Sequence, residues 1–183
     1  MTNTTSRRSF MQKTAIATTG LAFLSPSIVS AFTNNCPYEG YNPYADTKTD
    51  FRTVTLGEHV RVKGTIYNKK SLIPIADATV EVWHLSPNST KFRHRGKLKT
   101  NEDGTYNFIT DLPNKENAKM RRIYFKVSHK NTSYFTELLL VPITSSAYIT
   151  SKHWEENQEL GEKVLPVSKK LLNTTTINFN VSI

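Results

Sequence analysis

Apolar and polar residues alternate along several short segments of the chain, a pattern typical of half-buried β-strands. Turn-forming residues separate the segments; at residues 101–104, for example, Gly104 supplies the positive φ that a tight turn needs. Only residues 152–160 have good helical character. Many short strands at regular spacing predict an all-β protein, an antiparallel β-sandwich with one short C-terminal helix. The predicted strands are residues 60–67, 78–83, 105–109, 123–128, 134–141 and 177–183.

The composition is that of one globular domain. Of the 183 residues, 37% are hydrophobic and 10% aromatic, which is enough to build a packed core. The single cysteine, Cys36, excludes an internal disulfide framework and a cysteine-rich zinc or iron–sulfur site. The alternatives for Cys36 itself are a lone thiol or a bridge to another chain.

The first 31 residues have the features of an export signal. The paired Arg7 and Arg8, followed by Phe10, resemble a twin-arginine signal of bacteria. The apolar run at 14–24 is too short to span a bilayer, and small residues up to Ala31 suit a cleavage site. We therefore predict export by the twin-arginine route to the periplasm or the extracellular space, with no transmembrane segment in the mature chain. The alternative is an uncleaved helix that anchors the protein in the membrane.

Three regions follow from these patterns. Residues 1–31 form the signal, and residues 58–183 contain the predicted strands of the sandwich. Between them, residues 32–57 are rich in proline and tyrosine and are predicted to form an extended N-terminal arm laid over the sandwich. The sequence shows neither internal repeats nor a low-complexity linker.

The chain is basic, with a formal net charge of +9 at pH 7. The predicted signal contributes basic residues and no acid, and the remaining charges are dispersed along the chain, as expected of a solvated surface. For an exported protein, such a surface favours an anionic small molecule, an acidic glycan or anionic lipid, rather than nucleic acid.

Common catalytic and metal-binding motifs are not found. The five histidines show neither a His-x-His nor a His-x3-His spacing, and nothing resembles a nucleophile triad, a phosphate-binding loop or a paired-carboxylate hydrolase. His84 and His129 fall at the ends of predicted strands, where we expect surface residues.

Three stretches, taken in order, carry a resemblance to a known family. They resemble the core of the intradiol ring-cleavage dioxygenases, in particular their short exported members, over residues 58–141 and again at 176–183. The first stretch alone is also found in transthyretin-like and carboxypeptidase-regulatory-like sandwiches. The later two stretches make the resemblance to the dioxygenases more specific. The stretches are VKGTIY (62–67) with IPIADATVEVWH (73–84), FRHRG (92–96) with KTNEDGTYNF (99–108), and DLP (111–113) with RIYFKV (122–127) and FTEL (135–138).

The resemblance implies a β-sandwich of the intradiol dioxygenase core type that holds one non-haem ferric ion. In the family, two Tyr and two His bind the metal, and the phenolates suit a hard trivalent ion. The reaction opens a catechol ring between its two hydroxyls by inserting both atoms of O2.

The residues of this chain at the family's ligand positions have changed type. The first tyrosine corresponds to Phe92, or to Lys91 if the loop carries no insertion. Counting from the proline at 113, the second tyrosine falls at Glu116, and the histidine pair falls at Arg122 and Tyr124. We therefore predict that these four residues form a candidate pocket without metal, the alternative being that they only seal the former cavity, and we name no catalytic residue. Arg cannot release its proton to bind a cation, and Glu116 is well placed to pair with Arg122.

Three further residues are predicted to surround that pocket. His94 follows Phe92 closely, Lys119 corresponds to an arginine of the family, and Glu137 corresponds to a glutamine.

The resemblance and the replaced ligands together lead to a functional prediction. The protein is an exported, non-catalytic binding or interaction module with the dioxygenase sandwich, its partner an anionic or aromatic small molecule. One alternative is an active catechol-type dioxygenase that retains ferric iron in a remodelled site. Another is a transthyretin-like carbohydrate or adhesion module, in which Phe92, Glu116 and the Arg122–Tyr124 pair would lie scattered.

Overall fold

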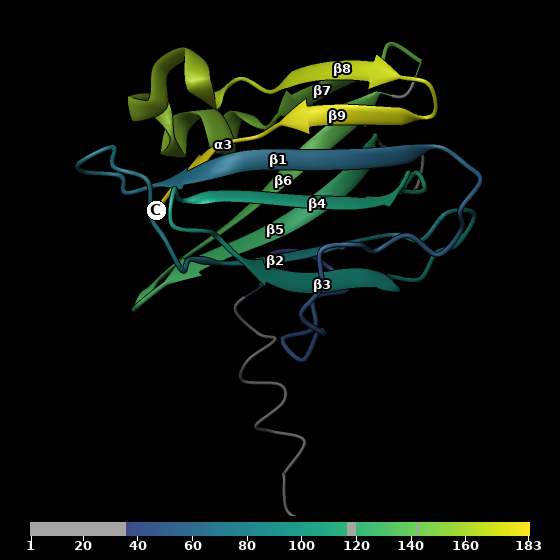
Figure 1. Ribbon diagram of the computed structural model, residues 1–183, viewed down its shortest axis with the longest axis horizontal. Helices are drawn as coiled ribbons and strands as arrows, with labels where there is room; N and C mark the ends of the chain where they lie inside the picture. The colour runs from purple at the N-terminus through teal and green to yellow at the C-terminus, as the bar shows by residue number, and fades with distance from the viewer. Residues whose placement is uncertain (1–35, 117–119, 142) are drawn as a thin grey trace, which may run out of the picture. The chain divides into compact units, whose positions relative to one another are not determined.

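The computed structural model describes residues 36–116, 120–141 and 143–183. The predicted signal at 1–31 and Lys119 lie outside the described residues. Two β-sheets face each other and enclose the core (Figure 1). The predicted all-β sandwich with one short α-helix is confirmed.

The first sheet is built around β1 (His59–Tyr67). One edge of β1 pairs antiparallel with β4 (Thr105–Asp111). The other edge pairs in parallel with β9 (Thr174–Asn178) and then with β10 (Val181–Ser182). Strand β8 (Val167–Leu171) completes the sheet beyond β9. The predicted single strand at 177–183 is therefore two short strands that follow one another along β1.

The second sheet is antiparallel throughout, in the order β3-β2-β5-β6-β7. Its strands are β3 (His94–Lys99), β2 (Thr79–His84), β5 (Arg121–His129), β6 (Thr132–Val141) and β7 (Ser146–Ile149). The first turn of α3 (Ser151–Glu156) is capped by the Thr150 hydroxyl, and a 3-10 helix (Gln158–Val164) follows α3. Within the described residues, no helix is long and apolar enough to cross a membrane.

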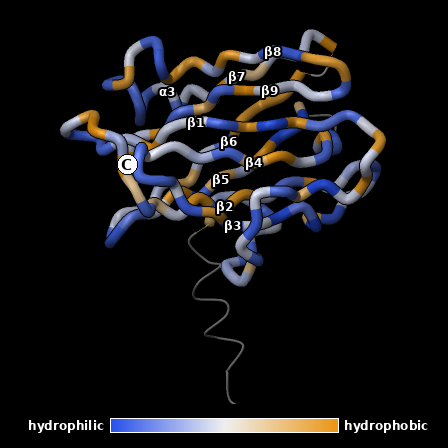
Figure 2. The backbone as a smooth tube through the Cα atoms, in the orientation of Figure 1, coloured by the Kyte–Doolittle hydropathy of each residue, from blue (hydrophilic) through white to orange (hydrophobic). Residues whose placement is uncertain are grey.

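Alternation of residue type along the strands separates the core from the outside (Figure 2). On β5, Ile123, Phe125 and Val127 are fully buried between the sheets. The intervening residues point to the opposite face because successive side chains of a strand alternate. Arg122, Tyr124 and Lys126 therefore share the outer face of the second sheet.

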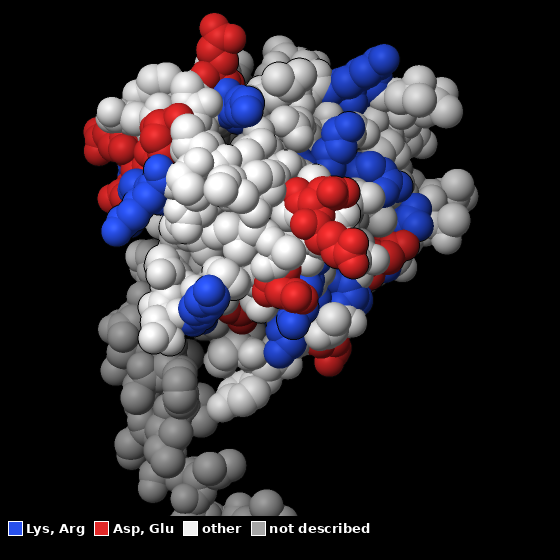
Figure 3. All heavy atoms as spheres, turned by 60° about the vertical axis from the view of Figure 1, so that its left-hand side comes forward, with Lys and Arg blue, Asp and Glu red and all other residues white. Residues whose placement is uncertain are grey.

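Residues 37–57 lie along the sandwich before β1 begins. Thr47 pairs with Lys97 of β3, and Asp50 pairs with Ile109 of β4, so the segment joins the two sheets at one edge. Phe51 is buried and packs against Phe108 in the core. On the face shown in Figure 3, basic and acidic side chains are interspersed.

Candidate functional site

The first group of interest lies on the outer face of the second sheet. Strand β5 places Arg122 and Tyr124 two residues apart on this face, and Glu137 of β6 is the register partner of Tyr124. The loop after β4 contributes Glu116, and the segment before β3 contributes Phe92. We call Phe92, Glu116, Arg122, Tyr124 and Glu137 the outer cluster.

The structure brings these predicted residues into contact. The Tyr124 hydroxyl donates to the Glu116 carboxylate at 2.6 Å. The Arg122 guanidinium forms an ion pair with Glu137, and its Nε lies 3.8 Å from Glu116. The ring centroids of Phe92 and Tyr124 are 6.2 Å apart.

Residues of the arm and of β2 pack against the aromatic rings of the outer cluster. Tyr38 packs on Tyr124 with ring centroids 4.8 Å apart, and Trp83 of β2 stacks on Tyr124 at 5.7 Å. Gly40 has φ of 77° and passes directly over Phe92, so that a Cβ there would lie 2.2 Å from the ring. Only glycine combines this conformation with such a close approach.

Charge states in the outer cluster follow from its contacts. Burial, and then the Glu116 carboxylate, raise the pKa of Tyr124 well above its usual value. Burial opposes the charge of Arg122, but the contact with Glu137 outweighs it and raises the pKa of the guanidinium. The phenol is therefore neutral and the guanidinium is charged.

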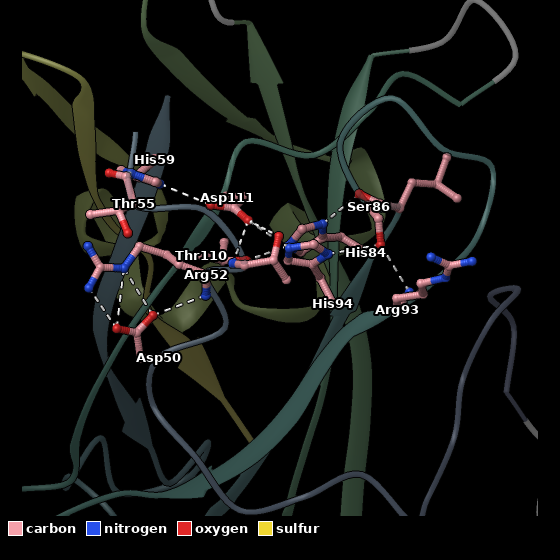
Figure 4. A network of polar contacts seen from close by, with 12 residues as sticks. Asp50, Arg52, Thr55, His59, His84, Ser86, Arg93, His94, Thr110 and Asp111 are labelled. Carbon is pink, nitrogen blue, oxygen red and sulfur yellow. Dashed lines mark hydrogen bonds and ion pairs between the residues drawn. The ribbon is translucent and has the colours of Figure 1, made fainter. Parts of the chain in front are cut away.

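A second group of polar residues surrounds Asp111, the last residue of β4 (Figure 4). The two carboxylate oxygens of Asp111 accept hydrogen bonds from two histidines, His59 Nδ1 at 3.1 Å and His94 Nε2 at 2.9 Å. The backbone N–H and the hydroxyl of Thr53 also donate to Asp111, each at 2.8 Å. We call Thr53, His59, Ser86, His94 and Asp111 the inner network.

His94 belongs to the inner network and does not join the outer cluster. It occupies an inward position on β3, and its Nδ1 lies 2.9 Å from Ser86 Oγ. The predicted surface position of His84 is wrong, because this residue is fully buried and stacks on His94. His84 Nδ1 donates to Leu85 O, and its Nε2 accepts from the Thr110 hydroxyl.

Beside the inner network is a cleft of about 620 Å³. Residues of the loop before β1 and of the loop after β2 form its sides. Ser86, His94 and Asp111 lie in its wall, and the basic residues Arg93 and Arg121 also line it. Sequence analysis missed this site because its three polar wall residues come from three separate elements with no characteristic spacing.

Comparisons with solved structures identify the fold. The chain is similar to the dioxygenase domain of a carbohydrate-binding fusion protein from Streptomyces sp. SirexAA-E, with a TM-score of 0.60 and 17% identity, over 80% of this chain and 94% of that one. An intradiol ring-cleavage dioxygenase from Tetranychus urticae matches with a TM-score of 0.59 and 18% identity, over 80% and 90%. The chain has the intradiol dioxygenase fold. The fold that the resemblance in the sequence implies is thereby confirmed.

Further comparison places the same fold among bacterial enzymes. A 3-chlorocatechol 1,2-dioxygenase from Rhodococcus opacus 1CP matches with a TM-score of 0.57 and 14% identity, over 87% of this chain and 78% of that one. No protein-family model matches the sequence, and no curated protein matches it. The likeness to the dioxygenases is therefore one of fold.

The residues of the outer cluster do not fit the ferric ion of the intradiol dioxygenase fold. A phenol that donates to Glu116 and resists deprotonation is not a phenolate ligand. The guanidinium of Arg122 lies in the same cluster and repels a cation. Within the described part of the chain, no three His, Cys, Asp or Glu side chains are arranged to hold a metal ion.

Replacing Arg122 by alanine is expected to destabilise the fold by about 2 kcal/mol, because the nearly buried carboxyl group of Glu137 would lose its partner. Urea unfolding of wild type and variant measures the change. Lys69→Ala is the matched control, since the Lys69–Glu156 pair is exposed and its loss should not change the midpoint. Equal midpoints for both variants would contradict a structural role for Arg122.

Stability is expected to fall as the pH drops below about 6.5, the pKa of histidine in an unfolded chain. Burial lowers the pKa of His84 to about 3 and that of His153 to about 4. Between those values and 6.5, the unfolded chain binds protons that the folded chain does not, so acid favours unfolding. From pH 6.5 to 4.5 the loss is on the order of 4 kcal/mol for the two residues together.

Urea midpoints at pH 7.0, 5.5 and 4.5 measure this dependence. We expect His153→Gln to reduce it, whereas His129→Gln, which alters a partly exposed residue at the end of β5, should leave it unchanged. Identical midpoints for wild type at all three pH values would contradict the assignment of neutral buried histidines.

Proposed function

We propose that this protein is an exported binding protein with the intradiol dioxygenase fold, in which the ferric ring-cleavage site has been replaced. Its ligand is a small anionic molecule that also presents an apolar or aromatic part. The export signal predicted for residues 1–31 supports a location in the periplasm or outside the cell.

The contacts of Arg122 are the main support for the loss of ring-cleavage activity. Arg122 occupies a family ligand position and is held there by Glu137 and Glu116. A charged guanidinium with two carboxylate partners leaves neither space nor suitable charge for a trivalent cation. Active ring cleavage, the alternative suggested by the fold, would need these ion pairs to break and Tyr124 to ionise.

The cleft fits the ligand better than the outer cluster does. The Arg93 side chain is exposed, and Arg121 Nη1 donates to Pro113 O while its Nε is buried without a hydrogen-bond partner in the described part of the chain. Val54 and Leu56 offer exposed apolar surface on the same cleft. Two guanidiniums beside apolar side chains suit an aromatic carboxylate.

A transthyretin-like adhesion module is less well supported. That alternative expects the residues at the family ligand positions to lie apart, whereas Phe92, Glu116 and Arg122 all reach the immediate surroundings of Tyr124.

Calorimetric titration with benzoate tests the proposal. We expect saturable binding that weakens about tenfold in Arg93→Ala, corresponding to about 1.4 kcal/mol. Arg93 is suited to the test because its hydrogen bond to Ser86 comes from the backbone and survives the substitution. Lys99→Ala, which removes an exposed cation of β3 outside the cleft, should bind as wild type does.

Oxygen uptake with catechol is the second measurement, made after incubation with ferric iron. The proposal predicts uptake no faster than in buffer. Catechol-dependent uptake that persists after removal of free iron would favour the dioxygenase alternative.

A further inference from the structure

In the wall of the cleft, a serine, a histidine and a carboxylate are joined by two hydrogen bonds. Ser86 Oγ lies 2.9 Å from His94 Nδ1, and His94 Nε2 lies 2.9 Å from Asp111 Oδ2 (Figure 4). We propose that Ser86, His94 and Asp111 form a hydrolytic site for carboxylic esters. This inference rests on the proposed function in one respect, that the cleft is where the ligand binds.

The protonation of His94 follows from its partners. A carboxylate can only accept, so Nε2 carries the hydrogen that is donated to Asp111. Nδ1 is then an acceptor, and the Ser86 hydroxyl donates its hydrogen to it. A serine that donates to a histidine, which in turn donates to a carboxylate, is the arrangement that activates serine as a nucleophile. The two ring nitrogens have exchanged places relative to the usual triad, which leaves the proton transfers the same.

Asp111 is held in its charged form. Burial opposes the charge, but the hydrogen bonds from Thr53 and His94 outweigh it and lower the pKa of the carboxyl. Asp111 therefore keeps accepting from His94 and orients the imidazole toward Ser86. It acts as a positioning residue, whereas Ser86 and His94 contact the reacting atoms.

His84 fixes the plane of the His94 ring from one side. The two rings are stacked, with centroids 4.9 Å apart and an angle of 28° between the planes. Burial lowers the pKa of His84 to about 3, so His84 stays neutral and does not place a second charge beside His94 when that residue takes up a proton.

Four proton transfers through His94 Nδ1 complete the reaction, two in each half. Ser86 Oγ bonds to the carbonyl carbon of the ester and passes its proton to His94 Nδ1; the bond to the alcohol oxygen then breaks, and His94 protonates that oxygen. Water attacks the acyl-serine in the same way, giving a proton to His94. The bond to Ser86 breaks, His94 returns the proton to Ser86, and the carboxylic acid leaves.

The side chains that line the cleft indicate which class of ester it would bind. Arg93 and Arg121 suit a substrate that also carries an anionic group, and Val54 and Leu56 suit its apolar part. The backbone N–H of Arg93 donates to Ser86 Oγ at 3.3 Å and to Lys91 O at 3.1 Å, so it orients the nucleophile and is not aimed at the oxygen of the ester carbonyl. Because donors aimed at that oxygen contribute strongly to acyl transfer, we expect slow turnover of activated esters.

Labelling of the full folded chain with an alkyl fluorophosphonate tests the proposal without knowledge of the substrate. Ser86 Oγ would bond to phosphorus with loss of fluoride, while its proton is taken up by His94. We expect one adduct per chain, placed on Ser86 by peptide mass mapping, and a labelling rate reduced about a hundredfold or more in His94→Ala. Thr90→Ala, an exposed hydroxyl of the same loop outside the cleft lining, should label as wild type does.

The positioning role of Asp111 is tested by the dependence of the labelling rate on probe concentration. In Asp111→Asn, the labelling rate at saturating probe should fall, and the half-saturating probe concentration should not change, because Asp111 orients His94 and does not bind the probe. A change confined to the half-saturating concentration would contradict the positioning role.

Benzoate binding measured on the same preparation separates the two proposals. If benzoate binds and Ser86 remains unlabelled, or another residue carries the adduct, the hydrolytic site is wrong and the binding cleft stands. If Ser86 is labelled and benzoate does not bind, the hydrolytic site stands and the preference for anions is wrong.

Discussion

Asp111→Ala is expected to lower the free energy of unfolding by about 4 kcal/mol. The substitution leaves His59 and His94 with buried donors that no longer have an acceptor, and it removes the acceptor of the partly buried Thr53 N–H. Each such group costs about 1 to 3 kcal/mol when it stays unsatisfied. A loss of this size is a large part of the stability of a domain, so urea unfolding should show a strongly shifted midpoint.

Asp50→Ala is the matched control for this prediction. Asp50 also accepts several hydrogen bonds from Arg52 (Figure 4), but this pair is exposed to solvent. We expect its midpoint to equal that of wild type. If Asp111→Ala unfolded at the same urea concentration as Asp50→Ala, the inner network would not be the buried anchor that its contacts indicate.

Gly64→Ala is expected to destabilise the protein by about 3 kcal/mol, at the upper end of the usual cost of overpacking. An added Cβ on β1 would lie 1.8 Å from the carbonyl oxygen of Phe179. That carbonyl cannot move away easily, because it accepts from the buried Tyr106 hydroxyl at 2.7 Å, and the Phe179 N–H is bonded to Lys63 O at 2.8 Å. Thermal and urea unfolding both measure the loss.

Gly161→Ala distinguishes a steric clash from backbone strain. Gly161 has φ of 57° and ψ of −133°, and nothing lies within 4 Å of an added Cβ, so the expected cost is about 2 kcal/mol from backbone strain alone. If Gly64→Ala cost no more than Gly161→Ala, the close contact between β1 and the residue after β9 would be contradicted.

Much of the fold was predictable because local pattern and burial agree. The alternating segments at 60–67 and 105–109 became β1 and β4, whose apolar positions face the core. Strand β3 has no such signal, since the residues that it turns inward are His94, Gly96 and Leu98. Pairing with β2 makes it a strand, and pairing between distant segments is not visible in local composition.

The two polar groups differ in how far the sequence could reveal them. Arg122 and Tyr124 are two residues apart on one strand, and counting from the proline at 113 located Glu116, so the outer cluster could be predicted. The inner network joins Ser86, His94 and Asp111 from separate loops and strands. Only the register of β2 with β3, together with the packing of the two sheets, brings these side chains within hydrogen-bond distance.

We propose that the intradiol dioxygenase fold of this protein has lost its ferric site. Elemental analysis of the protein purified from its own host, supplied with ferric iron, tests this proposal, together with a visible spectrum. We expect iron far below one atom per chain and a colourless protein. Near-stoichiometric iron with the red-brown band of a phenolate–iron complex would contradict it, because Tyr124 would then have to be ionised beside Arg122.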